Sequence, residues 1–291
     1  MAAMKWCVGS GLALAILAGM LSGCGKEEPA PPEGAPDGPR VAAPAPGPQP
    51  EPEPEPRPEP EAPAAASVFA AERDTRIFGH GSEQNFNGGQ SSRLRARSIG
   101  STSPEFIIVD FDTAAIKAFL AKHPGKKVIA TLVMAVRQVQ SGPGTLGVAA
   151  LQAGEDWVEG TKSQQTAGAG ESTYLSPRFD PAGGESIPWK RLDGTAADDV
   201  RDLIWDREAG RIRGLKNSRE ATAQDTPNVG NAGAAPLVSI ALDEKLLEDL
   251  VQNEMNRGLV LFTTGGALLD FFSCEQGQAH AKPRLELRVE E

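Results

Sequence analysis

Cysteine, histidine and tyrosine are scarce in this sequence, and their scarcity excludes several kinds of chemistry. The 291 residues include three cysteines, three histidines and one tyrosine. The histidines, His80, His123 and His280, lie far apart, and no HExxH motif or cysteine–histidine cluster marks a zinc site. The GxSxG motif of many serine hydrolases is absent as well. The sequence therefore indicates neither a zinc enzyme nor a serine hydrolase of that type.

The apolar run near the N-terminus is too short to cross a bilayer as a stable helix. This run, GLALAILAGML, follows Lys5 and ends in the small residues of LSGC, as a signal peptide does. The cysteine at the end of the pattern makes it resemble a bacterial lipoprotein signal. The resemblance implies that residues 1–23 are removed and that Cys24 becomes a lipidated N-terminus. It also favours the outer membrane or the cell surface, because Gly25 stands where an aspartate is associated with inner-membrane retention.

Removal of the signal would leave Cys24 and Cys274 as the only cysteines of the mature chain. With the first of them lipidated, no disulfide can form within one molecule. The folded domain is therefore expected to depend on its apolar core.

Residues 24–66 form a segment rich in proline and glutamate, as in PQPEPEPEPRPEPEAP. Such a composition cannot bury a core and favours an extended polyproline II chain. At about 3.1 Å per residue, some forty residues would reach roughly 100 Å from a membrane. We expect a disordered linker that holds the following domain away from the bilayer.

A positive charge excess, which nucleic-acid binding requires, is also missing. The whole chain carries a formal net charge of −10, and residues 25–63 contribute nine acidic and three basic residues to it. The domain after the linker therefore remains mildly acidic, and nucleic acid is not expected as a partner.

Residues 67–291 contain short apolar or alternating stretches separated by turn signals, which is typical of strands in a β-sandwich. We expect an all-β domain, a jelly-roll-like β-sandwich with one short connecting helix. The strand candidates are SVFAA, DTRIF, SRLRARS, PEFIIVDFD, KKVIATLVMAVRQV, TLGVAALQ, PLVSIAL, GLVLFTT, ALLDFFS and PRLELRV. Residues 159–236 are polar and rich in glycine, so they are expected to form binding rims or mobile insertions.

The expected helix is DEKLLEDLVQNEMNRG. Asp243 is a suitable N-cap, and Gly258 suits the left-handed position after the last turn. One face of this helix is apolar. Its members are Leu246, Leu247, Leu250, Val251 and Met255.

Arg93, Arg95 and Arg97 alternate with Leu94 and Ala96, so the arginines should share one face of a strand. Guanidinium groups spaced by about 7 Å could bind the carboxylates of an acidic polysaccharide. A solvated face with scattered ion pairs is the other interpretation.

Several blocks of the domain, taken together, resemble the DNRLRE domain, a β-sandwich module of bacterial and archaeal surface proteins. The blocks are RDTRIF, NFNGGQSSRLRAR, FIIVDFD, EDWVEGT, GLVLF, DFFSCEQ and KPRLELRV. Some members of this family are carbohydrate-binding modules that recognise alginate, so the resemblance implies a non-catalytic binding role. The helix-prone insertion TAAIKAFLAKHPGKK departs from the family pattern, as do the long loops between Tyr174 and Pro236.

Aromatic residues in the glycine-rich middle could stack on sugar rings or could anchor loops to the core. They are Tyr174, Trp189 and Trp205.

No cofactor is expected, although carboxylate oxygens are available as ligands for a structural Ca²⁺. Asp74 and Glu275 are the main candidates for such a site, together with Asp110 and Asp156. The residue spacing of a calcium-binding loop is absent.

Three functions follow from these patterns. The first is a lipid-anchored, non-catalytic surface module that binds an acidic polysaccharide or mediates adhesion. The second is a structural envelope protein that contacts other proteins. The third is a polysaccharide lyase or hydrolase, for which Tyr174 with His80 or His280 would be the acid–base candidates.

Overall fold

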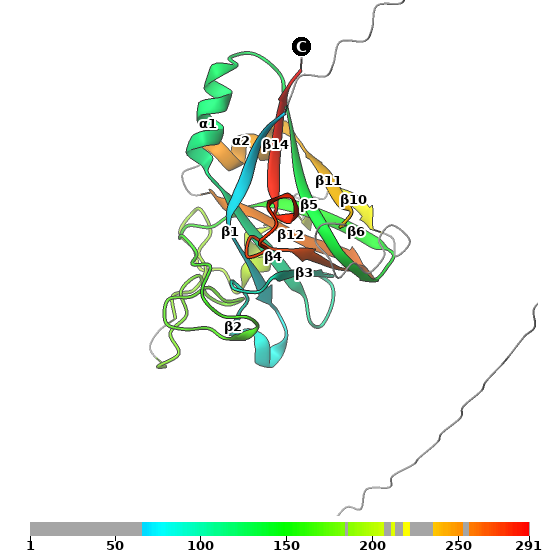
Figure 1. Cartoon of the computed structure of the whole chain (residues 1–291). Helices are drawn as coiled ribbons and strands as arrows, with labels where there is room; N and C mark the ends of the chain where they lie inside the picture. The colour runs from blue at the N-terminus through cyan, green and yellow to red at the C-terminus, as the bar shows by residue number, and fades with distance from the viewer. Residues whose placement is uncertain are drawn as a thin grey trace, which may run out of the picture. The chain divides into compact units, whose positions relative to one another are not determined.

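The computed structural model describes residues 66–183, 186–206, 211–212, 218–221, 235–252 and 256–290. The predicted signal peptide, Cys24 and the linker up to residue 65 lie outside these ranges. The described chain consists mostly of β-strands, with two α-helices (Figure 1), so the expected all-β class is confirmed.

The strands follow the candidates read from the sequence closely. The main strands are β1 (Ser67–Phe78), β3 (Arg93–Arg97), β4 (Glu105–Phe111), β5 (Val128–Ser141), β6 (Gly144–Gln152), β11 (Leu237–Leu242), β12 (Asn256–Gly265), β13 (Leu268–Phe272) and β14 (Arg284–Val289). Shorter strands are β2 (Phe86–Asn87), β7 (Gln165–Thr166), β8 (Trp205–Asp206), β9 (Arg211–Ile212) and β10 (Ser218–Ala221). The helices are α1 (Thr113–Lys122) and α2 (Glu244–Gln252).

The strand pairings close a ring, whereas two separate sheets were expected. The ring runs from β1 to β4, β3, β13, β5 and β14 and returns to β1. Outside it, β12 pairs with β4, β6 with β12, β10 with β6, and β11 with β5. The described fold is thus a six-stranded barrel with outer strands.

Two long strands explain this closure. The first four residues of β1 pair with β14, and the residues from Ala71 onward pair with β4, with an irregularity between Ala71 and Arg73. Similarly, the first part of β5 pairs with β14 and β11, and its last part with β13. A strand that bends at a bulge can pass from one sheet to the next. The candidates SVFAA and DTRIF are therefore one continuous strand.

Strand β4 is buried on both faces. Ile107 and Val109 belong to the main core, to which β3, β5, β6, β12, β14 and α2 contribute. Phe106 and Ile108 face the other way, into a second core beneath residues 153–183 and 186–204. Those residues form a loop layer, drawn in green at the lower left of Figure 1. The double burial explains why the sequence of β4 is almost continuously apolar.

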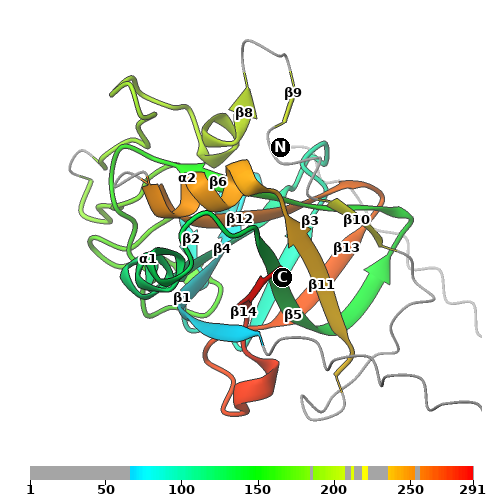
Figure 2. The ribbon, with the colours of Figure 1, turned by 90° about the horizontal axis from the view of Figure 1, so that it is seen from above.

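Helix α1 is an addition to the single helix that was expected. It begins after Asp112, whose Oδ1 accepts a hydrogen bond of 2.9 Å from the amide of Ala115. It covers the first ten residues of the helix-prone insertion and lies next to α2 (Figure 2).

Helix α2 begins as expected but ends early. Asp243 caps it, since its Oδ1 accepts from the amide of Leu246 at 2.7 Å. The expected end at Gly258 is wrong, because Gly258 lies in β12 with φ of 110°. A Cβ at this position would collide with the carbonyl oxygen of Val109, so glycine is required by close strand packing. Met255 lies outside the described residues.

Removal of the cap of α1 should have a measurable effect on stability. We expect Asp112→Ala to lower the free energy of unfolding by about 1 kcal/mol, because an amide of the first turn loses its partner. Urea unfolding measures this difference, and Asp112→Asn, which retains a capping oxygen, is the matched control. Equal stability of the Ala and Asn variants would contradict the assignment of this cap.

Within the described residues, neither helix is both long enough and apolar enough to span a membrane.

Candidate functional site

The arginines of β3 lie on one face of the strand, as the alternation predicts. Leu94 and Ala96 are fully buried in the main core, while Arg93, Arg95 and Arg97 point away from it and are partly exposed. Ion pairs with two buried carboxylates hold these side chains in place, and Arg93 and Arg97 keep about a third of their side-chain surface exposed.

Asp270 is the first of these carboxylates. It lies on β13 directly opposite Arg95, and its side chain is only 1% exposed. Arg95 binds it through two contacts, Nε to Oδ1 at 2.6 Å and Nη2 to Oδ2 at 3.0 Å. Gln140 on β5 donates to Oδ2 at 2.5 Å, and Nη1 of Arg93 lies 3.8 Å from the same oxygen. Asp270 therefore fixes Arg95 and orients Arg93.

Glu105 is the second carboxylate, and it also stands where the barrel closes. Its backbone pairs with that of Arg97, the pair that joins β3 to β4. Its side chain accepts a hydrogen bond of 2.6 Å from Nε of Arg76, which is buried, and lies 3.4 Å from Nε of Arg97. We call these six residues the arginine cluster. It comprises Arg76, Arg93, Arg95, Arg97, Glu105 and Asp270.

The arginine cluster contains two more positive than negative groups. Burial lowers the pKa of Arg76, and the positive charges of Arg95 and Arg93 lower it further. The negative charge of Glu105 opposes this decrease only in part. The hydrogen bond to Asp270 raises the pKa of Arg95. The side chains of Arg93 and Arg97 are 33% and 34% exposed, so an anion in solvent can reach them. The cluster thus carries a formal charge of +2, part of which faces solvent.

Arg97 also lines a pocket of about 510 Å³ at the end of the barrel. Three connections form the pocket: the one after β3, the turn between β5 and β6, and the turn between β12 and β13. The other lining residues are Ser98, Gly100, Ser101, Ser141, Gly265, Gly266, Ala267 and Leu268.

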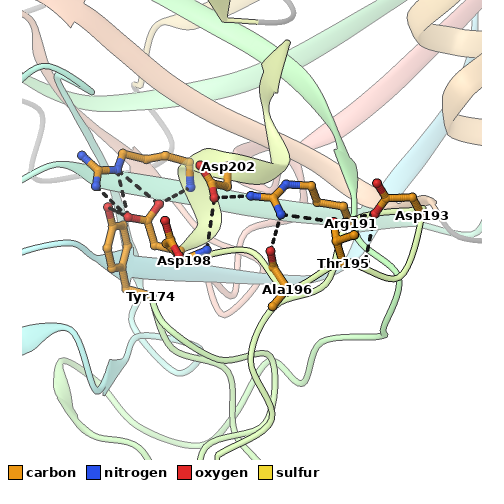
Figure 3. Close-up of polar contacts among 9 residues, drawn as sticks. Tyr174, Arg191, Asp193, Thr195, Ala196, Asp198 and Asp202 are labelled. Atoms are coloured by element: carbon orange, nitrogen blue, oxygen red, sulfur yellow. Dashed lines mark hydrogen bonds and ion pairs between the residues drawn. The ribbon is translucent and has the colours of Figure 1, made fainter. Parts of the chain in front are cut away.

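Tyr174 and Trp189, for which sugar stacking and loop anchoring were both considered, are buried and cannot stack on a ligand as they stand. Nε1 of Trp189 donates to the carbonyl of Thr173 at 3.1 Å. The hydroxyl of Tyr174 donates to Asp199 at 2.9 Å. In the neighbouring network, Arg191 donates to Thr195 Oγ1 at 3.2 Å and to the carboxylate of Asp202 (Figure 3). Both aromatic residues anchor the loop layer to the second core.

Trp205, the third aromatic candidate, lies in β8, where it pairs with Ile212 of β9. Its side chain is outside the described part of the structure.

Tyr174 does not have the surroundings of a catalytic base. Burial raises its pKa above the usual range, and the nearby charge of Asp199 adds to this effect. Its hydroxyl is bonded to Asp199, whereas His80 and His280 lie at exposed positions. Tyr174 is therefore hydrogen-bonded to an aspartate and not to either of the histidines considered for a lyase.

The residues considered for Ca²⁺ do not converge on a common point. Asp110 and Asp156 both bind Nη2 of Arg73, at 2.6 Å and 2.8 Å, so a guanidinium occupies the place a cation would take. Glu275 is exposed, and Asp74 is fully buried. Among the described residues, no group of three or more His, Cys, Asp or Glu side chains is arranged to hold a metal ion.

Asp74 instead connects the two ends of the domain sequence. Its Oδ2 accepts a hydrogen bond of 2.6 Å from the amide of Cys274, whose thiol is buried. Its Oδ1 is buried without a hydrogen-bond partner. Burial raises the pKa of Asp74 to about 7, and the charges of Glu159 and Glu275 act in the same direction.

Asp270, Glu105 and Gln140 were missed as site residues from the sequence. A signal for the two carboxylates was present, since Asp270 interrupts the apolar stretch ALLDFFS and Glu105 directly precedes the apolar run of PEFIIVDFD. A charge in such a run must be paired when the strand is buried. Gln140 had no comparable signal.

A scan against protein-family models found no match to this chain, and a search of curated proteins found none either.

Proposed function

We propose that this domain is a non-catalytic module that binds an acidic polysaccharide through the arginine cluster. The observation that carries the proposal is the surplus of guanidinium groups over carboxylates, with Arg93 and Arg97 still accessible. A polymer that carries carboxylate or sulfate groups would supply the missing negative charge.

The positions of the guanidinium groups favour a ligand with repeated charges. Arg93 and Arg97 lie four residues apart on one strand, so their Cα atoms are separated by about 13 Å. Their side chains are held by Asp270 and Glu105, so little conformational freedom would be lost on binding. Planar guanidinium groups bind carboxylates with two parallel hydrogen bonds.

The remaining features of the proposal come from the sequence. We infer that Cys24 carries a lipid, that residues 24–66 are a linker, and that the protein lies at the outer membrane or cell surface. The resemblance to the DNRLRE domain supports a glycan-binding module. We also propose that the strands of the barrel are arranged as in a jelly roll. Contact with another envelope protein is the alternative function.

Affinity electrophoresis in gels that contain alginate or pectate tests this proposal, with dextran as the neutral polymer. We expect the mature protein to be retarded by the acidic polymers alone, and less so as salt increases. The variant Arg93→Ala with Arg97→Ala should bind at least tenfold more weakly, because charged hydrogen bonds contribute about 1.5–3 kcal/mol each.

The matched control is Lys117→Ala with Lys122→Ala, which removes the same charge from exposed positions on α1. Equal loss of binding in both double variants would show that only net charge matters. Unchanged binding in the arginine variant would contradict the site. Recovery of an envelope protein without any glycan would support the alternative function.

A further inference from the structure

The pocket beside Arg97 has the composition of a sugar-binding site that selects for negative charge. Arg97 is the one charged residue among those that line it. Three serines add hydroxyl groups, and Ala267 and Leu268 add an apolar surface. Hydroxyl groups and a small apolar surface suit a sugar ring, and a guanidinium suits a carboxylate or a sulfate on that ring.

The pocket is held in shape by hydrogen bonds between the turns that form it. Ser141 Oγ donates to the carbonyl of Gly266 at 2.7 Å, and the amide of Gly266 donates to the carbonyl of Pro143 at 2.9 Å. The amide of Ile99 donates to the carbonyl of Thr263 at 2.8 Å. A site built in this way needs little rearrangement to accept a ligand.

Arg97 connects the pocket to the arginine cluster. Glu105 lies 3.4 Å from its Nε, and the side chain of Arg97 is 34% exposed. The guanidinium can therefore still donate two parallel hydrogen bonds to an anion. A volume of about 510 Å³ lies within the range of small-molecule sites, and it far exceeds the roughly 30 Å³ of one water molecule.

We propose that this pocket binds one sugar residue bearing a carboxylate or sulfate group, with Arg97 contacting the anion and Ser98, Ser101 and Ser141 contacting ring hydroxyls. This inference rests on the proposed function and extends it. The polymer would be recognised through one inserted residue, while Arg93 contacts a neighbouring charge.

Glycine positions offer a way to block the pocket without disturbing the fold. A Cβ on Gly100 would meet only Ser98 Oγ, at 3.9 Å, and Gly100 does not need a positive φ. Gly100→Leu should therefore fill the pocket. Gly277, on the connection after β13, has no atom within 4 Å of an added Cβ and does not line the pocket, so Gly277→Leu is the matched control.

The experiment is an NMR titration of the mature protein with glucose, glucuronate and glucose 6-sulfate, three probes that share one ring. We expect saturable shifts with glucuronate or glucose 6-sulfate and at least tenfold weaker binding of glucose. The tighter of the two anions identifies the charged group. Gly100→Leu and Arg97→Gln should each weaken anion binding at least tenfold, whereas Gly277→Leu should bind like the unmodified protein.

Alginate and pectate binding by the same variants separates this inference from the proposed function. If Gly100→Leu keeps full affinity for polymer while the Arg93 and Arg97 double variant loses it, the pocket inference is overturned and the proposed function stands. Binding of glucose as tightly as the anions also overturns the inference. If the unmodified protein binds no acidic polymer, the proposed function fails. Equal melting temperatures of the two leucine variants would show that the fold is unchanged.

Discussion

Arg95→Met should lower the free energy of unfolding by about 3–5 kcal/mol, the expected cost of leaving a buried charge without its partner. Asp270 would remain in β13 with its side chain 1% exposed and without its two-contact ion pair. Gln140 would still donate one hydrogen bond, and Arg93 is 3.8 Å away, so neither replaces Arg95. Urea unfolding at neutral pH measures the difference.

A double variant gives the decisive comparison. Arg95→Met with Asp270→Leu removes both charges and should recover most of the lost stability, since apolar pairs often replace buried ion pairs without loss. Arg93→Ala, which removes a more distant arginine that is one-third exposed, should cost less than 1 kcal/mol. A loss below 1 kcal/mol in Arg95→Met would show that Asp270 is not held as a buried anion.

This result also determines how binding should be tested. An Arg95 variant that fails to bind polysaccharide would be uninformative, because the loss of stability would be a sufficient cause. Arg93 and Arg97 are the appropriate positions, since both are accessible and neither is the main partner of Asp270.

Asp74→Asn should make the domain more stable at pH 8 and leave its stability nearly unchanged at pH 4. Burial raises the pKa of Asp74 to about 7, against about 3.9 in an unfolded chain. Between these values the folded state binds a proton that the unfolded state has released, so stability falls as pH rises from about 4 to about 7. The two pKa values differ by about three, and each unit corresponds to about 1.36 kcal/mol, so the free energy of unfolding should be about 4 kcal/mol lower at pH 8 than at pH 4 on account of Asp74.

The asparagine variant keeps an oxygen that can accept from the amide of Cys274, but it carries no charge. Urea unfolding of both proteins at several pH values between 4 and 8 should therefore show a steeper decline for the unmodified domain. Asp112→Asn is the matched control, because it makes the same substitution at an exposed helix cap. Parallel profiles for the Asp74→Asn variant and the unmodified domain would exclude a raised pKa for Asp74.

Local patterns in the sequence predicted the strands because each depends on neighbouring residues. The alternation of Arg95 with Leu94 and Ala96 determines which face each side chain occupies, whatever strand lies beside it. The continuous apolar run of β4 likewise predicted a buried strand, and the cap at Asp243 predicted where α2 begins. The early end of α2 was not predictable, because Gly258 is needed for contact with Val109, a residue far away in the sequence.

The sequence predicted only part of the candidate site, because the rest depends on contacts between residues far apart in the sequence. The sequence by itself determined that three arginines share one strand face, that the chain is acidic and poor in cysteine, and that its domain is built from strands. Only the tertiary structure decided that Asp270 lies opposite Arg95, that Glu105 lies between Arg76 and Arg97, and that the aromatic candidates Tyr174 and Trp189 are buried. Those facts depend on the register between strands as far apart as β3 and β13, which no local pattern encodes.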